Sequence, residues 1–147
     1  MELKNLKPNN LYIKFVGYST KNGKKEKSKD IVLNSLSFAS RSVNTKAVQL
    51  LKKVARYLGT VLELKNVYLR RNLVTIPTAV PANRRNYLIV KKVSKGISEA
   101  KLHLSLEKKL VQEFINTSKI KGSKSVLERD QVMKDAVKHK SNSHFRW

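Results

Sequence analysis

The chain has 147 residues, of which 32 are Lys or Arg and 10 are Asp or Glu, so its formal net charge at pH 7 is +22. It contains no Cys, which excludes disulfides, thiolate metal sites and cysteine nucleophiles. Because it has neither an apolar run near the roughly 18 residues of a membrane-spanning helix nor the apolar core of a secretory signal, we expect no membrane partner. The length predicts one domain with a modest core and basic extensions.

Acidic residues are missing from one long internal stretch. Residues 64–98 contain no Asp or Glu. The same residues include eight basic side chains, namely Lys65, Arg70, Arg71, Arg84, Arg85, Lys91, Lys92 and Lys95. Like charges this close repel one another and weaken a compact state unless a polyanion neutralises them. The pattern therefore indicates a nucleic-acid partner, and these eight side chains are predicted to contact it.

The first 29 residues are predicted to form a basic extension. Leu11, Ile13 and Phe15 share one face at period two, which predicts a short strand over residues 11–16. Residues 21–29 hold five Lys and one Glu with nothing apolar, so they predict a mobile basic loop. Its lysines are further candidate RNA contacts, with a solvated linker as the alternative interpretation: Lys24, Lys25 and Lys27.

Residues 30–59 are predicted to open the core with a strand and a helix. Alternation over residues 31–38 predicts the strand, although its apolar members do not keep to one face. Apolar residues then recur at three- and four-residue spacing, at Val48, Leu51, Val54, Ala55 and Leu58. This predicts an amphipathic helix over residues 45–58, with Asn44 or Thr45 as its N-cap and Gly59 as a left-handed C-cap.

Two strand-like runs follow, at residues 60–74 and 87–90, and a long loop is predicted to join them. Pro77 and Pro81 prevent a helix and favour extended backbone. A loop of this size inside a compact domain is usually functional. Its paired arginines suit phosphate, because Arg binds phosphate in a bidentate manner and stacks on bases. Tyr87 stands beside them as a stacking candidate.

The remaining residues complete the predicted fold class. A strand is predicted over residues 101–105, a helix over 125–137 and a basic tail over 138–147, in which Phe145 and Trp147 dock on a partner or stack on bases. The expected fold is α+β, with two helices packed on one face of a mainly antiparallel sheet, a long basic hairpin loop and basic terminal extensions.

The chain is expected to divide into three segments. They are a basic N-terminal extension at residues 1–29, an α+β core with the long loop at residues 30–115, and a C-terminal helix with a basic tail at residues 116–147.

The order of these elements resembles the small-subunit ribosomal protein S-ten family. The similar features, in chain order, are the strand at 31–38, Arg41, the helix ending at Gly59, the loop with Pro77, Pro81, Arg84 and Arg85, the aromatic strand at 87–90, the turn at 95–98 and the strand at 104–110. The resemblance covers residues 30–115. It implies rRNA and neighbouring ribosomal proteins as partners, in the head of the small subunit. Extensions at both ends favour a mitochondrial ribosome over the cytoplasmic ribosome of an A/T-rich bacterium.

We therefore predict a structural rRNA-binding protein of the small subunit that is not an enzyme and uses no cofactor, metal or small-molecule substrate. The alternatives are a large-subunit mitochondrial ribosomal protein with the same fold and a free-standing RNA-binding chaperone. An enzyme ranks last, because the three histidines are scattered. The acids of residues 99–113 are spaced to pair with nearby lysines rather than to hold metal ions.

Overall fold

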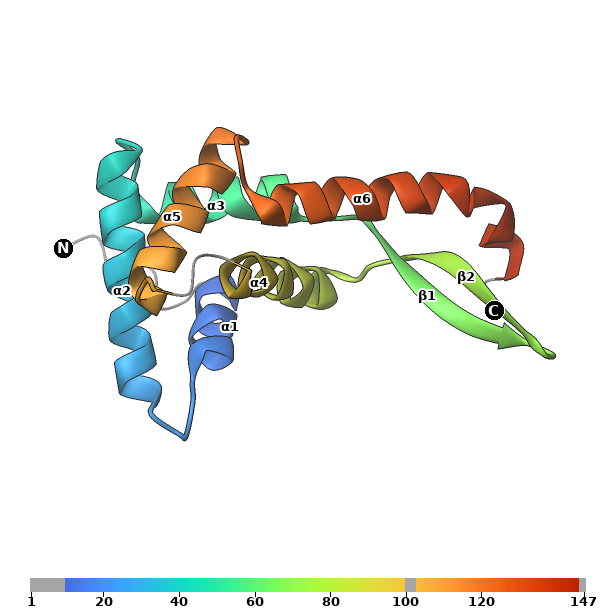
Figure 1. The fold of residues 1–147 in the computed structure, drawn as a ribbon, viewed down its shortest axis with the longest axis horizontal. Helices are drawn as coiled ribbons and strands as arrows, with labels where there is room; N and C mark the ends of the chain where they lie inside the picture. The colour runs from blue at the N-terminus through green and yellow to red at the C-terminus, as the bar shows by residue number, and fades with distance from the viewer. Residues whose placement is uncertain (1–9, 100–102, 146–147) are drawn as a thin grey trace.

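The computed structural model describes residues 10–99 and 103–145 of the chain. Within them the elements are α1 (Asn10–Ser19), α2 (Lys25–Ser42), α3 (Ala47–Leu58), β1 (Leu62–Leu69), β2 (Asn72–Ala79), α4 (Ala82–Ser98), α5 (Leu106–Lys119), α6 (Lys124–Lys138) and the 3-10 helix η2 (Lys140–Phe145). Helices form the body of the molecule, and the β1–β2 hairpin extends away from it (Figure 1). The α6 helix runs out of the body along the same direction as the hairpin (Figure 1).

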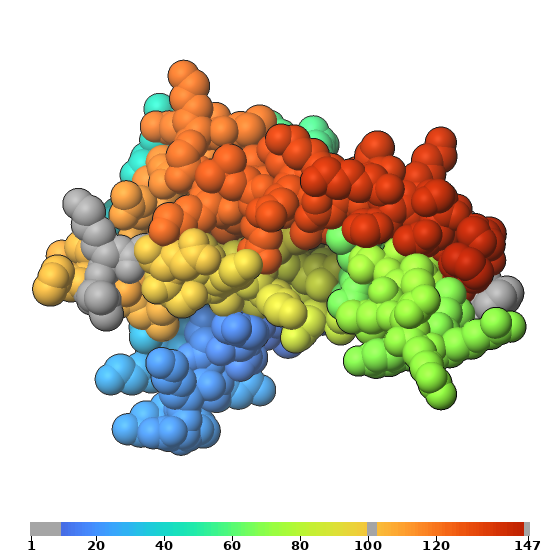
Figure 2. Space-filling view, turned by 45° about the vertical axis from the view of Figure 1, so that its right-hand side comes forward, coloured from blue at the N-terminus to red at the C-terminus, as the bar shows by residue number. Residues whose placement is uncertain are grey.

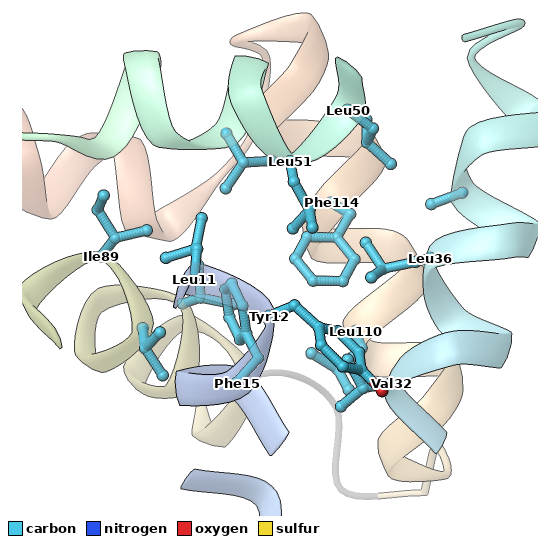
Figure 3. Close-up of a cluster of buried hydrophobic side chains, with 14 of the residues drawn as sticks. Leu11, Tyr12, Phe15, Val32, Leu36, Leu50, Leu51, Ile89, Leu110 and Phe114 are labelled. Atoms are coloured by element: carbon cyan, nitrogen blue, oxygen red, sulfur yellow. The ribbon is translucent and has the colours of Figure 1, made fainter. Parts of the chain in front are cut away.

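The hydrophobic core lies between helices rather than between helices and a sheet. Phe114 of α5 is fully buried and meets the ring of Phe15 of α1 edge-on, with 5.5 Å between the ring centroids. Figure 3 shows side chains from α1 to α5 converging on this pair. Those that it labels are Leu11, Tyr12, Val32, Leu36, Leu50, Leu51, Ile89 and Leu110. Burial of these apolar side chains is the main term that holds the helices together.

The α1 helix corrects the strand that was predicted over residues 11–16. Its buried residues are Leu11, Tyr12, Phe15 and Val16, a spacing of one and four that places them on one helical face. The period-two interpretation required Ile13 to face inward, but its side chain is half exposed. The predicted mobile loop over residues 21–29 is also wrong in part, because α2 begins at Lys25.

The α2 helix replaces the strand that was predicted over residues 31–38. Val32, Leu36 and Ala39 are fully buried at helical spacing. The serines between them remain compatible with a helix because their hydroxyls donate to carbonyls one turn back, as Ser35 Oγ does to the Val32 carbonyl at 3.0 Å. Tertiary burial therefore outweighs the modest helix propensity of this Ser-rich segment.

The predicted helix over residues 45–58 is confirmed as α3, but its caps differ. Lys46 is the N-cap residue and gives no side-chain cap hydrogen bond, while Thr45 Oγ1 is buried without a hydrogen-bond partner among the described residues. Gly59 is the C-cap residue but has φ −68°, so it is extended rather than left-handed. The predicted helix over residues 125–137 is confirmed as α6.

The segment predicted as a long loop is instead a tight hairpin followed by a helix. β1 pairs with β2 in an antiparallel register from Leu62–Ala79 to Leu69–Asn72, which leaves Arg70 and Arg71 as the turn. Pro77 is tolerated inside β2 because a two-stranded ladder leaves one edge of each strand unpaired. The strand predicted over residues 87–90 is wrong, since these residues lie in α4, which starts directly after Pro81. Pro suits this position because it has no backbone N–H to leave unsatisfied.

The α+β class and the antiparallel pairing are thus confirmed. The predicted arrangement of two helices on one face of a sheet is wrong, because the described sheet is a single two-stranded hairpin that projects from a helical body. The division at residues 29 and 115 stays a prediction, although helices from all three segments contribute to one core.

The C-terminal part of the described chain braces the hairpin. The Asn142 side-chain amide in η2 donates a hydrogen bond of 3.0 Å to the Thr75 carbonyl of β2. The predicted tail over residues 138–147 is therefore ordered on β2 as far as residue 145, and the Phe145 ring meets that of His144. Trp147 lies outside the described residues.

Candidate nucleic-acid interface

The end of the hairpin displays two of the predicted contact residues. Arg70 and Arg71 form its turn and are exposed, and Tyr68 just before them is 75% exposed. Arg70 has φ 55°, a left-handed backbone conformation that non-glycine residues rarely adopt. This conformation closes the two-residue turn of the hairpin, which lies at the outer end of the molecule (Figure 1).

Two more exposed cations continue this surface toward the body. Lys65 lies on β1 and Lys91 on the outer face of α4, and both are exposed. The described residues provide no hydrogen bond or ion pair to the side chains of Lys65, Arg70, Arg71 or Lys91. These four cations are therefore open to an anionic partner, and we call them the hairpin–α4 cations.

Arg84 is not a free cation, contrary to the expectation that the acid-free stretch lacks internal counter-charge. Its guanidinium donates to both carboxylate oxygens of Glu63, at 2.7 and 3.2 Å, and also lies 5.0 Å from the ring centroid of Tyr87. The hydrogen bond from Arg84 holds the pKa of Glu63 below its usual value, and the same pair raises the pKa of Arg84. In sequence, Glu63 directly precedes the acid-free stretch. In the fold, the pairing of β1 with β2 and the start of α4 after β2 place the Glu63 carboxylate next to Arg84 as its counter-charge.

Lys92 was predicted to contact phosphate, but the structure buries it. Its side chain is buried, with 6% of the residue exposed, and Nζ donates to the Leu58 carbonyl at 3.1 Å and to Thr60 Oγ1 at 3.3 Å. Burial lowers the pKa of Lys92 from 10.5 to about 8, with Glu128 opposing and Arg129 adding to that shift. This lysine joins α4 to the end of α3 and is not available to a partner.

Arg85 and Lys95 occupy intermediate positions. Arg85 is half-buried beside Gly59, and its Nε is buried without a hydrogen-bond partner among the described residues. Lys95 is exposed and pairs with Glu128 of α6 at 3.2 Å. The α4 helix therefore uses one side to connect elements of the body and the other to present charge.

The predicted contacts at the start of α2 form a separate group. Lys24, Lys25 and Lys27 are all exposed. The turn before α2 lies at the opposite side of the molecule from the hairpin tip (Figure 1). The fold therefore does not bring these lysines together with the hairpin–α4 cations, and a shared contact would need an extended partner.

The remaining acids do not form a cation site. Glu113 was expected to pair with a nearby lysine, but it is buried, and its Oε1 accepts hydrogen bonds from the Ser123 hydroxyl at 2.7 Å and from the Ser125 backbone N–H at 3.3 Å. Glu99 pairs with Lys124 at 3.6 Å. In residues 10–99 and 103–145 no group of three or more His, Cys, Asp or Glu side chains could hold a metal ion. No helix in these ranges is long and apolar enough to span a membrane.

The family of the chain follows from comparison with known proteins. The model of the family described as ribosomal protein S7p/S5e matches residues 4–140. The chain belongs to this family.

Curated relatives agree with the S7p/S5e assignment. The chain is 28% identical over 141 residues to the small ribosomal subunit protein uS7 of Syntrophus aciditrophicus, covering 95% of this chain and 88% of that protein. It is 25% identical over 139 residues to uS7 of Dichelobacter nodosus, with the same two shares. It is 25% identical over 137 residues to uS7 of Blochmanniella pennsylvanica, covering 93% of this chain and 86% of the relative.

Membership of the S7p/S5e family corrects the resemblance to the S-ten family. That resemblance depended on strands at residues 31–38 and 87–90, and both segments are helices, α2 and α4. Its motifs were spacings of common residues, so a similar order arose without a common fold. The prediction of a ribosomal protein is confirmed, while the particular family was wrong.

In this S7p/S5e chain the α1 helix contacts α4, and the sequence did not predict this contact. Lys14 of α1 donates a hydrogen bond of 2.8 Å to the Asn83 carbonyl in the first turn of α4, so α1 lies against the charged helix. The spacing of Leu11, Phe15 and Val16 contained the signal for this helix. Assigning residues 1–29 to an extension removed α1 from consideration as part of the interface.

Proposed function

We propose that this protein is a structural component of the small ribosomal subunit and that the hairpin–α4 cations anchor it to rRNA. The single observation that supports this most is that Lys65, Arg70, Arg71 and Lys91 are exposed and that the described residues provide no hydrogen bond or ion pair to their side chains. The relatives' name, small ribosomal subunit protein uS7, points to the same particle.

The proposed mechanism is electrostatic positioning. The turn arginines bind phosphates in a bidentate manner, while Lys65 and Lys91 act as point charges along the hairpin and α4. Such contacts follow the shape of the RNA backbone and unpaired regions more than base sequence. The exposed ring of Tyr68 is placed to stack on a base next to the turn.

Two groups of predicted residues have subordinate roles. Arg84 pairs with Glu63 beside Tyr87 at the base of the hairpin, and Lys95 is shared between Glu128 and the RNA. The lysines at the start of α2 supply a second contact on another face: Lys24, Lys25 and Lys27.

The location within the cell and the particle stays a prediction. A mitochondrial ribosome was expected, with the cytoplasmic ribosome of an A/T-rich bacterium as the alternative, and the relatives compared above are bacterial. The location in the head of the small subunit was implied only by the S-ten resemblance, which the family assignment has replaced. Neighbouring ribosomal proteins are proposed partners for the surfaces that do not face RNA.

The proposal is tested by removing the hairpin–α4 cations together. The variant is Lys65→Ala, Arg70→Ala, Arg71→Ala and Lys91→Ala in one chain. Binding to small-subunit rRNA is measured as a function of salt concentration. About 0.7 to 0.9 counterions are released per phosphate contact. Four lost contacts therefore make the negative slope of log affinity against log salt less steep by about three.

A matched control removes four exposed lysines elsewhere: Lys52, Lys108, Lys119 and Lys134. This control has the same net charge as the first variant but retains the hairpin–α4 cations, so it is expected to keep most of the salt dependence of the wild type. Equal losses in both variants, or an unchanged slope in the first, would contradict the anchoring role. Sedimentation of the tagged wild-type chain with small-subunit rRNA is expected; sedimentation with large-subunit rRNA, or at the top of the gradient, would favour the large-subunit or chaperone alternative.

A further inference from the structure

A cleft of about 620 Å³ lies between α1, α4 and α5, away from the hairpin. The buried side chains of Phe15 and Leu110 contribute to its lining and form an apolar floor. Tyr18, at the end of α1, stands at the edge with 54% of its surface exposed. Figure 2 shows α1 in blue below α4 in yellow on this side of the molecule. The volume is within the range of about 300–1,000 Å³ of pockets that hold small molecules.

The rim of the cleft is cationic. Lys21, Lys91, Lys95 and Lys109 line it, and its lining contains no Asp or Glu. In the described part of the chain, only Lys95 among these four has an ion pair, with Glu128. An apolar floor beneath unpaired ammonium groups is complementary to a ligand that joins a flat, weakly polar ring to a negative charge.

We propose that this cleft receives one unpaired nucleotide of the bound RNA, with its base against Tyr18 and the apolar floor and its phosphates beside the lysines. The proposal rests on the proposed function, because the RNA that supplies the nucleotide is the one anchored by the hairpin–α4 cations. Lys91 belongs to both the anchoring surface and the cleft, so one strand following α4 reaches both.

A base is favoured over an apolar side chain of a protein partner by the charge of the rim. Four lysines without a carboxylate among the lining residues would repel most basic ribosomal partners, whereas every nucleotide brings a phosphate. Unpaired bases of RNA are commonly splayed out and stacked on aromatic side chains. An acidic peptide carrying an aromatic residue is the competing occupant, and the experiment below includes it.

The experiment compares two RNA pentanucleotides that carry the same charge. One contains a central 2-aminopurine, and the other has an abasic site at that position, so only base insertion distinguishes them. The full chain is expected to bind the 2-aminopurine oligonucleotide about 5- to 100-fold more tightly, as expected for one stacked base, and to quench its fluorescence. Salt dependence is expected to be equal for both, since they have the same phosphates.

Variants assign this preference to the cleft. Tyr18→Ala is expected to remove it and Tyr18→Trp to restore it, while Phe38→Ala, which removes a ring 53% exposed on α2, leaves it intact. Lys21→Gln with Lys109→Gln is expected to weaken both oligonucleotides and lower both salt slopes by one to two. Circular dichroism and thermal unfolding confirm that each variant is folded.

Several results would overturn the proposal. They are equal affinity for the two oligonucleotides, no binding of either, a preference that survives Tyr18→Ala, or tighter and Tyr18-dependent binding of a Glu-rich peptide with a central Phe. Binding to small-subunit rRNA is measured with the same samples. If that binding and its salt slope persist while the base preference is absent, the cleft assignment fails and the anchoring function stands; if the rRNA binding is also lost, the proposed function fails.

Discussion

The guanidinium group of Arg84 donates two hydrogen bonds to the carboxylate of Glu63, at 2.7 and 3.2 Å, and so connects the first turn of α4 to the base of β1. This pair crosses the junction at which the hairpin leaves the helical body. Because the two residues are 21 positions apart in sequence, their contact exists only once β1 has paired with β2 and α4 has started. Together with the hydrogen bond from the Asn142 side chain of η2 to the Thr75 carbonyl of β2, this pair joins the hairpin to the helical body.

Glu63→Gln is expected to release Arg84 for contact with RNA. Affinity for small-subunit rRNA at low salt should rise, and the slope against salt should steepen by up to about one. The loss of folding stability should stay within about 1 kcal/mol, because the pair is partly solvent-exposed. Asp135→Asn changes the net charge equally but breaks an ion pair with Lys138 on α6. An equal steepening in both variants would mean that net charge, and not the freed Arg84, is responsible.

Lys92 should make folding stability depend on pH in the alkaline range. Its pKa is about 8 in the folded protein and 10.5 when exposed, so the unfolded chain binds more protons between these values. Stability therefore rises with pH across this window, by about 1.4 kcal/mol per unit at most, and the cost of burying the ammonium group is greatest below pH 8. Urea unfolding at pH 7.5 and 9.5 measures the change.

Matched variants isolate the contribution of Lys92. Lys92→Met lacks the titrating group, so its stability should rise less between the two pH values, by on the order of 2 kcal/mol. Lys91→Met changes the exposed neighbour and should keep the wild-type dependence. Identical pH profiles for wild type and Lys92→Met would contradict the buried position of this ammonium group.

Two glycine substitutions should change stability in opposite directions. A Cβ at Gly96 in α4 would lie 2.8 Å from Ser125 Oγ and 3.1 Å from Glu113 Oε1, so Gly96→Ala should destabilise the fold by about 1–3 kcal/mol. A Cβ at Gly17 in α1 would meet nothing within 4 Å, and Gly17→Ala should stabilise by about 0.5–1 kcal/mol through the unfolded chain and helix propensity. Thermal unfolding of both variants is the measurement, and a neutral Gly96→Ala would show that the packing of α4 on α5 and α6 is looser than described.

The core should be far more sensitive to truncation than the helix surface. Phe114 is fully buried against Phe15, so Phe114→Ala should cost about 3–5 kcal/mol. Phe38 is 53% exposed on α2, and Phe38→Ala should change stability by about 0.5 kcal/mol or less. Chemical denaturation with equal m-values gives both numbers, and a small effect at Phe114 would be incompatible with a core centred on α5.

The α3 helix could be predicted from the sequence because its apolar residues keep to one face, whereas the α2 helix could not. The buried Leu50, Leu51 and Val54 of α3 stand on one face, with lysines on the other. In α2 the buried face includes serines, such as Ser28 and Ser35, so hydropathy alone did not reveal a helix. These serines are compatible with burial because their hydroxyls bond to carbonyls one turn back, which is a property of the folded helix.

The candidate interface was predictable as a charge pattern but not residue by residue. Arg70 and Arg71 were predicted as phosphate contacts and are exposed at the turn. Lys92 was placed in the same group, yet α3 and α4 bury it against the Leu58 carbonyl. The cleft beside Tyr18 was not predicted, since its lining comes from three helices far apart in sequence.

Composition and order along the chain were sufficient to indicate a basic protein with a polyanionic partner, because charge is a sum over residues and does not depend on how they pack. Only the tertiary structure decided which cations remain free. In the folded chain Glu63 pairs with Arg84, Lys92 is buried, and Arg70 and Arg71 lie at the end of a hairpin. Desolvation and ion pairing are set by neighbours in space, so residues of the same type in one stretch of sequence came to have different roles.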